Sequence, residues 1–171
     1  MAAVDVSYQI TGQGPALYLV HGIGSRKTTW DELVKGLSDR YTCVSYDLRG
    51  HGDSPVAATP YSLEDMVDDL EALRQKLGHQ HIHIAGHSLG GMIGPAYALA
   101  YPQHTLSVSL LSTAAGRSEE DRAKLQAVGD AMEQNGIVET LGTFVARWFT
   151  DDFMAAHPEI IEARLQQVKD T

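Results

Sequence analysis

The sequence has little cysteine, little positive charge and no long apolar run. Its 171 residues include one cysteine, so no disulfide can form within the chain. With 13 basic and 22 acidic residues the net charge is −9, which argues against nucleic-acid and anionic-membrane partners. No apolar run reaches the length of a membrane span, and the first residues lack a signal-peptide pattern. These absences favour a soluble, cytoplasmic protein.

The remaining composition is that of a globular protein. Hydrophobic residues make up 43% and charged residues 20% of the chain, and its length is sufficient for a sizeable core. The lone Cys43 lies in a strand-like run and is expected to be a buried small side chain, not a nucleophile. No spacing of His, Cys and Asp residues suggests a metal site. We therefore expect neither a metal nor a cofactor.

Strand and helix patterns alternate at short spacing through residue 112. Apolar and β-branched runs predict strands at residues 4–10, 16–20, 41–46, 81–85 and 106–111. Apolar residues three and four apart predict helices at residues 28–37, 63–77 and 92–101, the last with a kink at Pro95. This order predicts an α/β fold with a mainly parallel sheet and helices on both faces.

The character of the sequence changes near Gly116. A capping-box pattern at residues 118–121 and three apolar stripes after it predict helices, and no strand pattern follows. Pro158 fits the first position of the last helix. We therefore expect a core at residues 1–115 and a helical cap or lid segment at residues 116–171.

A serine flanked by glycines follows the fourth predicted strand. Gly86, Ser88 and Gly90 form the pattern Gly-x-Ser-x-Gly between a β-branched strand and an apolar helix. This pattern is typical of a nucleophile elbow, a strained turn that exposes the serine hydroxyl above the sheet. A side chain at either glycine should collide with a neighbouring strand or helix. The Leu89 N–H would open the helix, where free donors favour an oxyanion.

Two further motifs lie at the carboxyl ends of predicted strands, where α/β sheets gather function. Residues 21–24 (His-Gly-Ile-Gly) follow the second strand, and residues 46–54 (Tyr-Asp-Leu-Arg-Gly-His-Gly-Asp-Ser) follow the third. Together with the elbow, these motifs resemble the α/β-hydrolase superfamily over residues 4–115. Residues 112–150 are similar to the capped 3-oxoadipate enol-lactonase branch. The resemblance implies an α/β-hydrolase fold with the start of a helical cap.

The resemblance also implies roles for individual residues. Ser88 matches the nucleophile, and the backbone N–H groups of Ile23 and Leu89 match the donors of an oxyanion hole. The implied reaction is hydrolysis of a small ester or lactone: Ser88 attacks the carbonyl, the two amides hold the oxyanion, and water resolves the acyl-enzyme.

Several polar residues near these motifs are expected to be architectural. His21 should brace the loop that carries the first oxyanion donor and should not act as the base. Asp47, Arg49 and His51 match a loop that is mostly structural in the superfamily. His87 is expected to pack beside the nucleophile.

The substrate-binding candidates are aromatic or cationic. They are Trp30 in the core and Phe144, Arg147, Trp148 and Phe149 in the C-terminal segment. Helix packing is the alternative for the aromatic residues, and a solvated charge is the alternative for Arg147. The enol-lactonase resemblance suggests that Arg147 pairs with a substrate carboxylate.

An acid and a histidine that would complete a Ser-acid-His triad are missing after the elbow. The superfamily places both after later strands, but residues 111–115 (Leu-Ser-Thr-Ala-Ala) contain no acid. His104 and His157 stand before a strand and at a helix start. Residues 106–111 would also be left as an exposed edge strand. We therefore expect a C-terminally truncated chain, nearly inactive alone, that a complementary C-terminal polypeptide would complete.

Other functions remain open. Carbon–carbon bond hydrolases and cofactor-free haloperoxidases share this elbow, and the fold also serves as a non-catalytic binding module. A purely structural remnant is a further alternative. Haloalkane dehalogenases and epoxide hydrolases are disfavoured, because their elbow nucleophile is an aspartate and Ser88 stands at this position.

Overall fold

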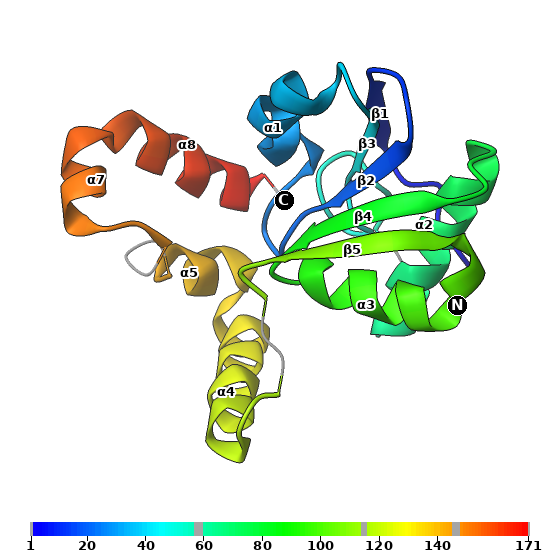
Figure 1. Cartoon of the computed structure of the whole chain (residues 1–171). Helices are drawn as coiled ribbons and strands as arrows, with labels where there is room; N and C mark the ends of the chain where they lie inside the picture. The colour runs from blue at the N-terminus through cyan, green and yellow to red at the C-terminus, as the bar shows by residue number, and fades with distance from the viewer. Residues whose placement is uncertain (1, 57–59, 114–115, 145–147, 171) are drawn as a thin grey trace. The chain divides into compact units, whose positions relative to one another are not determined.

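A computed structural model describes residues 2–56, 60–113, 116–144 and 148–170 of the chain. The chain divides into two compact units, residues 1–114 and 115–171 (Figure 1). The candidate functional motifs all lie in the first unit.

The first unit is built on a five-stranded sheet with the order β1-β3-β2-β4-β5. Its strands are β1 Tyr8–Thr11, β2 Ala16–Val20, β3 Thr42–Tyr46, β4 Ile82–His87 and β5 Thr105–Leu111. Only β1 runs antiparallel to its neighbour; β3, β2, β4 and β5 are parallel to one another. The predicted mainly parallel α/β sheet is therefore confirmed.

The first strand begins later than its alternating pattern predicted. Residues 4–7 are not part of β1, and side chains accept from the backbone amides of Val4 and Ser7. The Val4 N–H donates to Asp69 Oδ1 at 2.7 Å, and the Ser7 N–H donates to Ser54 Oγ at 2.9 Å. The segment is thus tied to α2 and to a loop.

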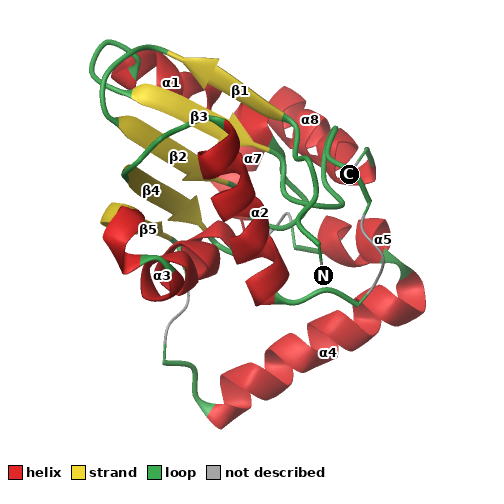
Figure 2. Cartoon of the chain, turned by 90° about the vertical axis from the view of Figure 1, so that its right-hand side faces the viewer, coloured by secondary structure: helices red, strands yellow, loops and turns green. Residues whose placement is uncertain are grey.

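Helices cover both faces of this sheet (Figure 2). They are η1 Lys27–Trp30, α1 Asp31–Leu37, α2 Leu63–Lys76, α3 Gly90–Ala100 and η2 Pro102–His104. The pleat of β2 separates two cores, since successive side chains point to opposite faces. Tyr18 and Val20 pack with residues of α2 and α3, and Leu19 packs with Trp30 and Cys43 on the η1 and α1 side. The predicted burial of Cys43 is confirmed at 1% exposure.

The last strand of the sheet pairs only with β4 in the described part of the chain. Leu106 and Leu110 are each 53% exposed, and Leu99 of the neighbouring helix α3 is 85% exposed. The predicted exposed edge strand is therefore present. Such an edge presents unpaired backbone groups beside apolar side chains.

In the second unit, the secondary structure of the described residues is helical. It contains α4 Glu119–Asn135, α5 Ile137–Gly142, α7 Asp151–Ala156 and α8 Pro158–Lys169. The Ser118 hydroxyl accepts from the Asp121 N–H at 3.1 Å at the start of α4, and Pro158 opens α8, as their positions predicted. Within the described ranges, no helix is both long and apolar enough to cross a membrane.

Candidate active site

Ser88 occupies a sharp turn between β4 and α3. Its φ is +53°, in the left-handed region that serine rarely adopts, and Leu89 returns to helical geometry with φ −57°. A residue held in this region stores about 1–3 kcal/mol of strain, which surrounding contacts must offset. Strain of this kind gathers at functional turns, and the strand-turn-helix context is the one that a nucleophile elbow requires.

The glycines of this turn are required by close backbone packing. A Cβ on Gly86 would lie 2.1 Å from the Gly90 carbonyl oxygen. A Cβ on Gly90 would lie 2.1 Å from the Val20 carbonyl oxygen at the end of β2. Backbone atoms on both sides block a side chain, so the predicted steric reason for the two glycines is confirmed.

The loop after β2 lies against the elbow. A Cβ on Gly22 would approach Ser88 Cβ to 3.0 Å and His87 Nδ1 to 3.2 Å, so His87 does lie beside this loop. Among the residues that the structure describes, the N–H groups of Ile23 and Leu89 donate to no acceptor. An available amide therefore lies in each of the two segments that meet at the candidate nucleophile.

His21 holds the loop after β2 from inside the fold. Its side chain is fully buried. The Leu48 N–H donates to His21 Nε2 at 3.0 Å, so the ring proton sits on Nδ1 and is donated to the Gly22 carbonyl oxygen at 2.8 Å. Both ring nitrogens bind backbone groups, and the predicted bracing role is confirmed.

His51 is a second brace on the same loop. The Gly24 N–H donates to His51 Nε2 at 3.2 Å, and His51 Nδ1 lies 3.1 Å from the Arg49 carbonyl oxygen. The His51 and His21 rings lie 5.3 Å apart. Burial lowers the pKa of His51 below its usual value, outweighing the Arg49 hydrogen bond and the charge of Asp47. The neutral ring that accepts from Gly24 is therefore the favoured form.

Asp47 fixes the far end of the loop through Lys27. The buried Asp47 carboxylate accepts from the Lys27 N–H and from Lys27 Nζ, both at 2.6 Å. Lys27 Nζ also reaches Asp53 at 2.7 Å. Burial lowers the pKa of Lys27, but the hydrogen bonds to the two carboxylates prevail and raise it above its usual value. The sequence motifs gave no indication of this ion pair.

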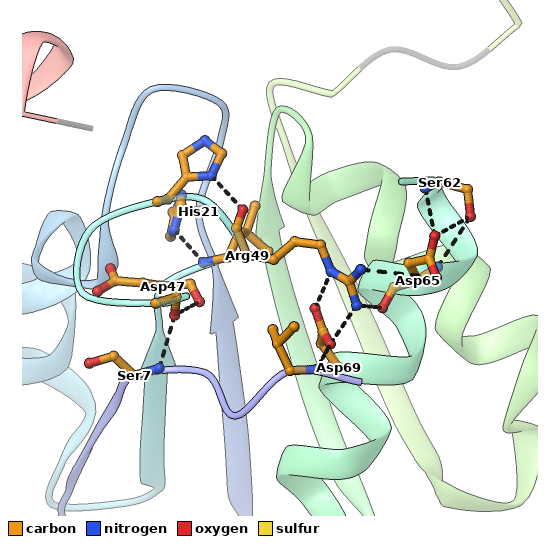
Figure 3. Close-up of polar contacts among 11 residues, drawn as sticks. Ser7, His21, Asp47, Arg49, Ser62, Asp65 and Asp69 are labelled. Carbon is orange, nitrogen blue, oxygen red and sulfur yellow. Dashed lines mark hydrogen bonds and ion pairs between the residues drawn. The ribbon is translucent and has the colours of Figure 1, made fainter. Parts of the chain in front are cut away.

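Arg49 ties the loop after β3 to α2, as Figure 3 shows. Its Nε and Nη2 each lie 2.7 Å from an oxygen of Asp69, and Nη2 donates to the Asp65 carbonyl oxygen at 2.9 Å. The guanidinium also lies over the Tyr61 ring, 5.6 Å from its centroid. Arg49 is fully buried in these contacts, which fits the predicted architectural role.

No base or acid reaches the candidate nucleophile within the described residues. Ser88 Oγ makes no hydrogen bond there. His104 Nδ1 lies 2.8 Å from the Gln80 carbonyl oxygen, and His157 lies 3.5 Å from Glu159 in the second unit. The rings of His21 and His51 are committed to the backbone.

The three candidate substrate-binding residues lie in two separate parts of the chain. Trp30 is 6% exposed and packs with Leu17 and Leu19 under α1, the packing role considered as its alternative. Trp148 lies in the second unit, where the Arg164 guanidinium stacks over its ring at 4.6 Å. Arg147 lies outside the described residues.

A parallel α/β sheet with a strained serine turn after its fourth strand defines a class of protein, the α/β hydrolases. Residues 15–165 match the family described as alpha/beta hydrolase fold. The chain belongs to this family.

Three known proteins illustrate the similarity. 3-Oxoadipate enol-lactonase 2 of Acinetobacter baylyi is 31% identical over 163 residues, which is 93% of this chain and 60% of the relative. A fluoroacetate dehalogenase of a Burkholderia species is 37% identical over 113 residues, 63% of this chain and 37% of the relative. The crystal structure of the enol-lactonase from Burkholderia xenovorans LB400 superposes with a TM-score of 0.86 at 28% identity, covering 98% of this chain and 66% of that one. The chain thus spans less than two thirds of the length of these relatives, all of which are hydrolases.

Proposed function

We propose that the protein is a serine hydrolase of a small ester or lactone, with Ser88 as the nucleophile. The observation that carries the proposal is the strained Ser88 turn, with the available amides of Ile23 and Leu89 on either side of it. Two backbone N–H groups facing one oxygen stabilise the charge that develops when a hydroxyl attacks a carbonyl. The similarity to enol-lactonases supports a lactone or ester as the substrate class.

The 171 residues alone should be a poor catalyst. A serine hydroxyl needs a base, and no described residue is placed to take its proton. Catalysis without the rest of a triad is limited to roughly 10³–10⁴-fold over water, from the oxyanion hole and binding. We propose that an acid and a histidine from outside these residues complete the site, and that residues 116–171 form a helical cap or lid segment.

A fluorophosphonate probe read by intact-mass spectrometry tests the nucleophile. We expect slow, single labelling of the chain, lost in Ser88→Ala. The matched control is Ser112→Ala, because Ser112 also has a positive φ, is exposed and lies at the end of β5. Labelling that survives Ser88→Ala would refute the assignment. No labelling, even of a longer chain that supplies the missing acid and histidine, would favour a binding module over an enzyme.

A further inference from the structure

Residues at and directly after the end of β5 form hydrogen bonds with the backbone of Ser88, whose carbonyl shares a peptide group with the proposed oxyanion donor. The Thr113 hydroxyl donates to the Ser88 carbonyl oxygen at 2.9 Å, and the Ser88 N–H donates to the Leu111 carbonyl oxygen at 3.0 Å. Residues 111–113 therefore bind the backbone on both sides of the Ser88 Cα. This short segment lies outside the motifs at residues 21–24, 46–54 and 86–90.

The Ser88 carbonyl and the Leu89 N–H belong to the same peptide unit. Because that unit is planar, a hydrogen bond that fixes the direction of the C=O also fixes the direction of the N–H, which points the opposite way. A donor on the carbonyl oxygen also polarises the amide and strengthens its N–H as a donor. Thr113 thus acts on Leu89 through the Ser88 carbonyl.

The helix supplies no competing donor to this carbonyl in the described residues. The Met92 N–H, which would reach it in a regular first turn, instead donates to the Leu89 carbonyl oxygen at 2.9 Å. Without the Thr113 hydroxyl the Ser88 carbonyl would lose its protein partner, and the strained turn would lose a contact that offsets its φ of +53°.

Gly91 provides the space for this contact. A Cβ on Gly91 would lie 2.5 Å from Thr113 Cβ and 2.8 Å from Thr113 Oγ1. The second glycine of the Gly-Gly pair therefore admits the threonine side chain against the start of α3.

We propose that Thr113 is a positioning residue that orients and polarises the Leu89 N–H for the oxyanion. This inference rests on the proposed function of Ser88 and Leu89. It predicts that Thr113→Val, which keeps the shape and removes the hydroxyl, weakens the oxyanion donor, whereas Thr113→Ser preserves it. Gly91→Ala should reproduce the Thr113→Val effect from the α3 side by displacing the threonine.

The test combines amide NMR with probe labelling. We expect the Leu89 amide proton to shift upfield in Thr113→Val and Gly91→Ala but not in Thr113→Ser. Fluorophosphonate labelling should slow by about fivefold to tenfold in the first two variants, the factor that one hydrogen bond is typically worth. Thermal unfolding provides the control, since a merely structural role would lower the melting temperature and leave labelling and the Leu89 resonance unchanged.

The two proposals fail in different ways. If the wild-type chain labels at Ser88 and Thr113→Val labels equally fast with an unshifted Leu89 amide, the positioning role is refuted. If a longer chain that supplies the missing acid and histidine also fails to label, but the Leu89 amide still shifts in Thr113→Val, the contact stands and the serine chemistry is refuted. Should Thr113→Val fail to fold, Gly91→Ala provides the same two readouts.

Discussion

Protonation of His51 is predicted to loosen the loop that follows β2. The neutral ring accepts from the Gly24 N–H at Nε2 and binds the Arg49 carbonyl oxygen at Nδ1. A proton on Nε2 turns this acceptor into a donor that faces another donor. The groups around the ring are His21, neutral and bound to the backbone, and the Asp47 carboxylate, which is already paired with Lys27.

The sign of the effect follows from the lowered pKa. Burial keeps fewer protons on His51 in the folded state than in the unfolded chain. Its contribution to the free energy of unfolding is therefore complete above about pH 6.5, the usual value, and is lost as the pH falls through the folded-state pKa. Removing both hydrogen bonds in His51→Ala should cost about 2–4 kcal/mol at neutral pH, because a buried donor and a buried acceptor lose their partners.

Urea unfolding of the wild type and His51→Gln at pH 8.0 and at pH 5.5 measures the effect. Glutamine offers one donor and one acceptor without a titrating ring, so the stability advantage of the wild type should shrink at the lower pH. His81→Gln is the matched control, because this exposed side chain lies directly before β4, at the opposite end of that strand from Ser88. A difference between wild type and His51→Gln that is the same at both pH values would refute the reasoning.

Two further substitutions test the packing of the site. Gly90→Ala should destabilise the fold by about 2 kcal/mol or more, because its Cβ would overlap a backbone oxygen of β2. The matched control is Gly129→Ala in α4, where the new Cβ meets nothing within 4 Å and should stabilise the helix by about 0.5–1 kcal/mol. Arg49→Met should cost about 3–5 kcal/mol by leaving the buried Asp69 carboxylate unpaired, whereas the exposed Arg40→Met should cost less than about 1 kcal/mol. Urea unfolding measures both pairs, and equal losses within a pair would contradict the argument.

The sequence was sufficient for the fold of the first unit because each strand and helix carries its own periodic pattern. The apolar run 16–20 marked β2, and the apolar residues three and four apart at 63–77 marked α2. The predicted start of β1 at residue 4 was wrong, because the true start depends on contacts from distant parts of the chain. An alternating pattern at residues 4–7 cannot show that distant side chains on α2 and in the loop after β3 take the amides.

Local motifs located the candidate nucleophile but not the contacts that hold it. Gly86 and Gly90 revealed the turn, because a tight reversal leaves glycine in the sequence. Lys27 and Thr113 left no such signal, since each acts through a partner about 20 or more residues away. A lysine after a strand and a threonine after an edge strand are ordinary at the level of sequence. The pairing of β5 with β4 ends at Leu111, and the residues directly after it bring the threonine to the elbow.

The pairing of β5 with β4 links the chemistry of the elbow to an edge strand of the sheet. The left-handed conformation of Ser88 persists only while neighbouring contacts offset its strain, and two of those contacts come from Leu111 and Thr113 at the end of β5. An edge strand with one neighbour opens more easily than a central one, because fewer contacts oppose local unfolding. Whatever stabilises β5 against β4 therefore also stabilises the geometry of Ser88 and of the Leu89 amide. In this fold the pairing of the edge strand therefore determines how well the candidate oxyanion donor is preorganised.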